Sequence, residues 1–127
     1  MWCSACSADG PSVERFCREV AQLLETDLVN FEASSADDPA VRSGLARTAD
    51  QFDDVVEASP EAVRPSAEVL AGLTRALSDA VNDTDPRDPF ERAAAILAAQ
   101  QQFEDDLPQA LERYNAYVAQ NCAPRPG

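Results

Sequence analysis

The sequence predicts an all-α protein: an up-down-up-down four-helix bundle closed by a disulfide between its first and last helices. Apolar residues recur every three or four positions along most of the chain, and no segment alternates with the two-residue period of a strand. Three of the expected helices begin with a capping residue followed by proline. The 127 residues make one domain. We expect a flexible arm over 1–10, the bundle over 11–123 and a flexible tail over 124–127.

The first expected helix covers Val13–Phe31 and begins after Ser12, a good N-cap residue. The second begins with Asp38 as N-cap and Pro39, because proline at the first helical position loses no hydrogen bond. Each has an apolar stripe that we expect to face the core. The first stripe consists of Val13, Phe16, Cys17, Val20, Leu23, Leu24, Leu28 and Phe31. The second consists of Val41, Leu45, Thr48, Phe52, Val55 and Val56.

The third expected helix follows Ser59 and Pro60, and Pro65 should kink it or delay its start. The fourth follows Asp88, and Pro108 breaks or bends it before the segment that ends at Cys122. The inward residues of the third helix are Val63, Leu70, Leu73, Leu77 and Val81. Those of the fourth are Phe90, Ala94, Leu97 and Phe103, followed by Leu107, Leu111, Tyr114 and Val118.

A disulfide between Cys17 and Cys122 fits this topology. The first and last helices of an up-down-up-down bundle are antiparallel neighbours, so the start of one lies level with the end of the other. Closing so long a loop stabilises a fold by about 4 to 5 kcal/mol in the chain-entropy model. A structural disulfide implies an oxidising compartment. The printed sequence begins without a signal peptide, so we expect an export signal upstream of Met1.

Cys3 and Cys6 allow three interpretations. One is an unstructured end with incidental cysteines, and the other two assign the cysteines a chemical role. Trp2-Cys3-Ser4-Ala5-Cys6 looks like the Trp-Cys-x-x-Cys motif of thioredoxin-like oxidoreductases, although no strand precedes it. Alternatively, the small residues before Cys6 match the remnant of a bacterial lipobox, and Cys6 is then the lipid-modified residue. The redox interpretation makes the protein a thiol-disulfide oxidoreductase, and the lipobox interpretation makes it an envelope lipoprotein.

Two acidic clusters have the composition of cation sites. The first cluster, Asp50, Asp53, Asp54 and Glu57, lies on one side of the second helix. The second, 82–88, lacks the glycine and the terminal glutamate of a calcium loop. We interpret the first as a solvated face and the second as turn and cap chemistry. We expect no metal site and no cofactor.

The composition excludes several functions. A net charge of −13 repels nucleic acid and anionic headgroups and favours a soluble monomer. No apolar run is long enough to span a bilayer, so contact with a membrane would need a lipid anchor. The absence of histidine removes the common catalytic triads, nearly all zinc catalysis and ferritin-like di-iron sites. We therefore expect no enzyme and no catalytic residue. Tyr117 lies off its helix's stripe and is our candidate for a partner surface.

Residues 11–122 resemble small Ala/Asp-rich helical proteins that actinobacteria export, often as lipoproteins. The resemblance rests on Phe16-Cys17 in the first helix and on Tyr117-Val118-Ala119-Gln120-Asn121-Cys122 at the end of the last. It implies an exported helical protein with a Cys17–Cys122 bridge and carries no activity with it. We expect a non-enzymatic extracytoplasmic protein that binds a protein or a small ligand in the cell envelope. An alternative is a carrier that holds a small hydrophobic ligand where Pro65 and Pro108 splay the helices.

Overall fold

A computed structural model describes residues 11–32 and 38–122, with the backbone alone described for 24–32. This part of the chain is all-α and contains five helices and no strand. The helices are α2 (Val13–Glu32), α3 (Asp38–Ala58), α4 (Arg64–Asn82), α5 (Pro89–Gln101) and α6 (Leu107–Asn121). The predicted class is confirmed. The predicted count of four helices is not, because the last expected helix is divided into α5 and α6.

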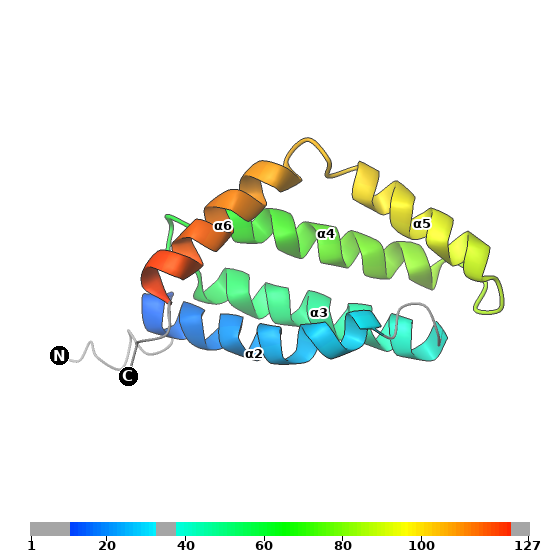
Figure 1. Ribbon diagram of the computed structural model, residues 1–127, viewed down its shortest axis with the longest axis horizontal. Helices are drawn as coiled ribbons and strands as arrows, with labels where there is room; N and C mark the ends of the chain where they lie inside the picture. The colour runs from blue at the N-terminus through cyan, green and yellow to red at the C-terminus, as the bar shows by residue number, and fades with distance from the viewer. Residues whose placement is uncertain (1–10, 33–37, 123–127) are drawn as a thin grey trace.

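Figure 1 shows α2, α3 and α4 lying side by side, with α5 and α6 forming a bent pair over α4. Helix α4 is central, because it packs against α3, α5 and α6. Helix α2 packs along α3 and meets α6 near the end of α6 that carries the disulfide. The start of α5 lies at the opposite end of the molecule from this contact (Figure 1).

Two predicted N-caps are present. The hydroxyl oxygen of Ser12 accepts a hydrogen bond from the backbone N–H of Arg15 at 3.0 Å. The carboxylate of Asp88 accepts from the backbone N–H groups of Phe90 at 3.1 Å and Glu91 at 3.0 Å. These bonds satisfy amides that a helix start leaves without an intrahelical partner. The starts of α2 and α5 therefore follow from local sequence.

The other two starts differ in detail from the expectation. Helix α4 begins at Arg64 with Pro65 in its first turn, so the delayed start is the alternative that the structure shows. Ser59 does not cap it, because its hydroxyl donates to the carbonyl of Val55 at 2.6 Å. Asp38 is the first residue of α3, and its carboxylate accepts hydrogen bonds from arginine side chains.

The core consists of two clusters of buried apolar side chains. The first core lies near the disulfide and contains Phe16, Val20, Leu23, Val55, Ala58, Val63, Ala67, Leu70 and Tyr114. The second core contains Val41, Leu45, Leu77, Val81 and Ala99. The predicted stripes of α2, α3, α4 and α6 supply most of both. Two stripe residues are more exposed than expected, Val13 and Leu111, at 39% each. Leu24, Leu28 and Phe31 lie outside the described side chains.

The predicted stripe of α5 is wrong. Phe90 is 85% exposed, Leu97 is 54% exposed, and Ala94 is exposed as well. Residues at the same helical spacing but on another face point inward: Arg92 and Ala99 are buried and Ile96 packs against the second core. The helix has apolar residues on all sides, so periodicity alone did not identify the buried face.

Phe103 is half-buried beside α4, in the segment between α5 and α6. A β-carbon at Gly72 of α4 would lie 3.3 Å from the ring of Phe103. The missing side chain at Gly72 therefore lets the bend between α5 and α6 lie close against the central helix.

Candidate functional site

The disulfide pair is where the sequence places it. Cys17 on α2 and Cys122 at the end of α6 form a bridge with a Cα–Cα distance of 5.4 Å, inside the usual range. Both are half-buried and pack against the first core. The bridge connects the two helices at one end of the fold. Cys3 and Cys6, with the redox and lipobox interpretations, lie outside the described residues.

Tyr117 is half-buried beside this bridge. Its ring meets the ring of Phe16 edge-on, with centroids 5.3 Å apart and an interplanar angle of 86°. Tyr114 makes a second edge contact with Phe16 at 6.0 Å. Such contacts stabilise aromatic packing. The geometry of Tyr117 is that of a core-edge side chain, with part of the ring left to solvent.

Three residues of the first acidic cluster, Asp50, Asp53 and Glu57, form ion pairs with neighbouring arginines. Arg75 of α4 donates to Asp50 at 3.2 Å and to Asp53 at 2.5 Å. These hydrogen bonds, that of Asp53 first, raise the pKa of Arg75 above its ordinary value. Arg15 lies 3.9 Å from Glu57. Within the described residues no three potential ligands converge on a metal position.

The acidic loop between α4 and α5 has turn and cap geometry. Asp85 accepts a hydrogen bond from the backbone N–H of Arg87 at 2.9 Å, an Asx turn, and Asp88 caps α5. The Thr84 hydroxyl donates to the carbonyl of Val81 at 2.6 Å. Local backbone bonding therefore accounts for the residues that resembled a calcium loop.

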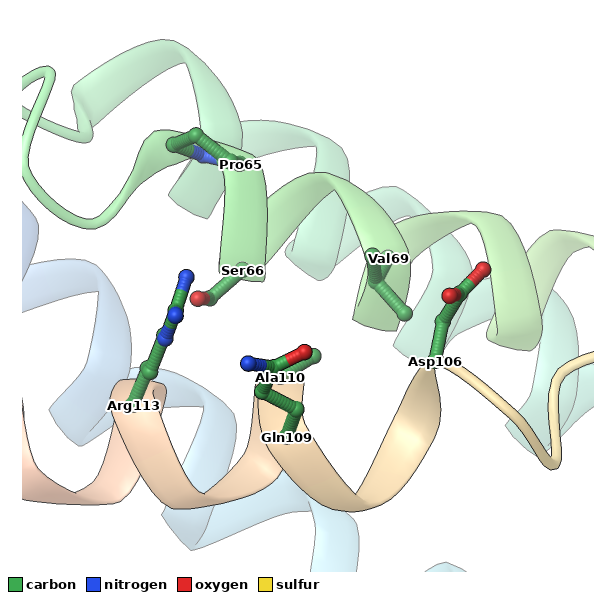
Figure 2. A pocket seen from close by; sticks show the side chains of 7 residues that line it. All are labelled: Pro65, Ser66, Val69, Asp106, Gln109, Ala110 and Arg113. Carbon is green, nitrogen blue, oxygen red and sulfur yellow. The ribbon is translucent and has the colours of Figure 1, made fainter.

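A shallow groove of about 130 Å³ lies between the first turns of α4 and of α6. Figure 2 shows Arg113 extending from α6 toward Pro65 and Ser66, with Asp106 at the other end. Val69, Gln109 and Ala110 complete its lining. Pockets for drug-sized ligands measure about 300 to 1,000 Å³ and are mainly apolar. The groove does not fit the hydrophobic ligand of the carrier alternative.

A buried polar cluster, missed in the sequence, joins α3, α5 and the loop between α4 and α5. Asp38 accepts from Arg42 at 2.6 Å and from Arg92 at 2.9 Å, and Arg42 also donates to the carbonyl and hydroxyl oxygens of Thr84 at 2.9 and 3.1 Å. The side chains of Asp38 and Arg92 are each only 10% exposed. The hydrogen bond from Arg42 is the main cause that lowers the pKa of Asp38. Desolvation of the carboxylate acts in the opposite direction, and the hydrogen bond from Arg92 lowers the pKa further.

This cluster lies on the inward side of α5, where Ile96 and Ala99 also pack against the second core. Because Arg92 points inward to Asp38, the opposite side of the helix faces solvent. We call this side the α5 face; it consists of Phe90, Ala93, Ala94 and Leu97. Its members are all exposed and lie on adjacent turns, so they form one continuous apolar strip. The signal in the sequence was a second stripe on α5, Arg92-Ile96-Ala99, whose first member is charged.

None of the helices in the described ranges, 11–32 and 38–122, combines the length and the apolar character needed to cross a bilayer. No protein-family model, no curated protein and no solved structure matches the chain.

Proposed function

We propose that this chain is a non-enzymatic binding or accessory protein of the cell envelope that binds a protein partner through the α5 face. The observation that carries the proposal is the 85% exposure of Phe90 on a helix that the Asp38–Arg92 ion pair holds in a fixed orientation. Phenylalanine is enriched in protein interfaces, and continuous apolar strips on a surface mark interaction sites. A fixed helix also loses little conformational entropy on binding.

The proposed location and architecture rest on other observations. The Cys17–Cys122 geometry supports an oxidising compartment outside the cytoplasm. The small residues before Cys6 in the sequence support Cys6 as the lipid-modified tether. The packing of α5 and α6 against α4 supports a further proposal, that the pair takes the place of a bent fourth helix in an up-down-up-down bundle. The net charge of −13 supports a monomer before the partner binds.

Photo-cross-linking in native cells tests the proposed function. A photoreactive amino acid at Ala94 of the α5 face should cross-link to one discrete protein, and the same amino acid at exposed Ala119 of α6 should not. The product is identified by mass spectrometry and purified for direct binding measurements. Burying a phenylalanine contributes about 1.5 to 3 kcal/mol, so Phe90→Ser should weaken binding by about tenfold or more.

Two results would contradict the proposal. One is an Ala94 cross-linking pattern indistinguishable from that of Ala119. The other is a purified partner that binds Phe90→Ser as tightly as the original protein.

A further inference from the structure

The charges around the α5 face identify the kind of partner, an inference that rests on the proposed function. Four exposed acids lie at the N-terminal end of the face: Asp83, Asp85, Asp88 and Glu91. One cation, Arg87, lies among them. After the C-terminal end of α5, in the turn that leads to α6, come Glu104, Asp105 and Asp106, all exposed, and Asp106 lines the groove between α4 and α6. Between the two ends the one charged residue is Arg92, which is buried against Asp38.

We propose that the α5 face binds an amphipathic helix of another protein, with an apolar stripe at its centre and Lys or Arg at both ends. Helix α5 has 13 residues and is therefore roughly 20 Å long, which sets the separation of the partner's basic ends. Phe90 and Leu97, two turns apart, are the raised anchors. Ala93 and Ala94 between them leave a low region in which side chains of a facing helix fit.

The same charges exclude two other occupants of this face. A second copy of the chain would bring acidic ends against acidic ends or against an uncharged face, on top of a net charge of −13 in each copy. An anionic membrane surface would be repelled by both ends. A helix with an apolar centre and basic ends complements the apolar face and the acids at both of its ends. Neither a second copy of the chain nor an anionic membrane does so.

Three synthetic helical peptides of about 20 residues test the inference, since that length allows a helix to cover α5. The first has a Leu/Phe stripe and Arg/Lys at both ends. The second keeps the stripe and has Glu in place of Arg/Lys. The third keeps the basic ends and has Ser/Gln in place of the stripe. Binding is followed by fluorescence anisotropy of the labelled peptide, and amide chemical-shift changes in NMR spectra of the full chain locate the site.

We expect the first peptide to bind at 89–101 and at least about tenfold more tightly than either of the others, a difference of about 1.4 kcal/mol per factor of ten. The double substitution Phe90→Ser with Leu97→Ser should weaken it by about tenfold or more. Leu111→Ser, at a 39% exposed position on α6, is the matched control and should change binding less than about twofold.

A second pair of variants tests the acidic ends. Glu104→Gln with Asp105→Asn should weaken the first peptide by about threefold or more at ~0.01 M salt, and the effect should shrink at ~0.1 M, where the Debye length falls from about 30 Å to about 10 Å. Glu61→Gln with Glu68→Gln makes the same change in net charge at exposed positions near the start of α4. This control pair should have the smaller effect.

The outcomes separate the two proposals. If the second peptide binds the α5 face as tightly as the first, the basic partner is overturned while a docking function of α5 stands. The helix-docking inference is overturned by a different result: the first and third peptides bind equally, the chemical-shift changes are spread over the acidic surface, and Phe90→Ser has no effect. In that case the cross-linking from Ala94 decides the proposed function by itself.

Discussion

Phe16 and Phe90 show how differently one residue type is used at two helix starts. Phe16 is 0% exposed, and its ring meets the edges of two tyrosine rings in the first core. Phe90 is the second residue of α5 and is 85% exposed. Removing a buried aromatic ring leaves a cavity and loses dispersion contacts on every side, whereas removing an exposed one leaves only solvent. Replacing Phe16 should therefore lower the stability of the fold, whereas replacing Phe90 should leave the stability nearly unchanged and weaken binding of the partner.

The matched substitutions Phe16→Ala and Phe90→Ala test this contrast. Phe16→Ala should lower the free energy of unfolding by about 3 to 5 kcal/mol, because the ring is fully buried. Phe90→Ala should change it by less than about 0.5 kcal/mol. Urea unfolding under oxidising conditions gives both values. Equal losses at the two positions would show that Phe90 is a core residue and that the original stripe prediction for α5 was right.

At the scale of elements, the orientation of α5 is decided by a polar side chain. Two stripes compete on this helix, and the one that contains Arg92 is buried, because Arg92 meets Asp38 while Ala99 fits the second core. A buried ion pair contributes little net stability against apolar alternatives, yet removing one partner leaves an uncompensated charge. We expect its effect here to be on specificity, because the other orientation of α5 would separate Arg92 from Asp38.

Acidification should weaken this cluster selectively. The pKa of Asp38 is lowered by Arg42 and Arg92, so its contribution is present above the unfolded pKa of about 3.9 and is lost as pH falls through the lower folded value. The difference in Tm between the original protein and Asp38→Asn should therefore be large near neutral pH and should shrink below about pH 4. Calorimetry over this pH range measures it.

Asp54→Asn is the control for this experiment. It removes one negative charge from an exposed position of the same helix and so reports the effect of net charge alone. A Tm difference for Asp38→Asn that persists unchanged to the lowest pH would show that the aspartate acts through its shape and not through its charge.

The contrast between α2 and α5 explains which parts were predictable. Ser12 and Asp88 cap helices through bonds to amides two or three residues away, so sequence suffices to place those starts. The disulfide followed from topology, because antiparallel ends must meet. The inward face of α5 includes the contact of Arg92 with Asp38, 54 positions earlier, and the bend after α5 lies against α4 at Gly72. Neither long-range contact leaves a periodic signal.

At the scale of the whole molecule, the two ends of the fold are held by different chemistry. One end has the disulfide and the first core, where α2 and α6 meet. The other has the Asp38 cluster, the second core and the start of α5. Helix α4 runs the length between them (Figure 1). A net charge of −13 opposes compaction, so a covalent bond between distant segments is an effective constraint.

Replacing both bridging residues, Cys17→Ser with Cys122→Ser, should lower the free energy of unfolding by about 4 to 5 kcal/mol in the chain-entropy model, given a sequence separation of 105. Cys3→Ser with Cys6→Ser is the control and should leave the urea midpoint unchanged. Binding of the basic peptide should survive removal of the bridge under folding conditions, because the α5 face is held by Arg92 and Asp38 at the far end. Loss of binding together with the bridge, at a temperature where α5 remains helical by NMR, would mean that the two ends are coupled through α4 and that the disulfide sets the orientation of the binding helix.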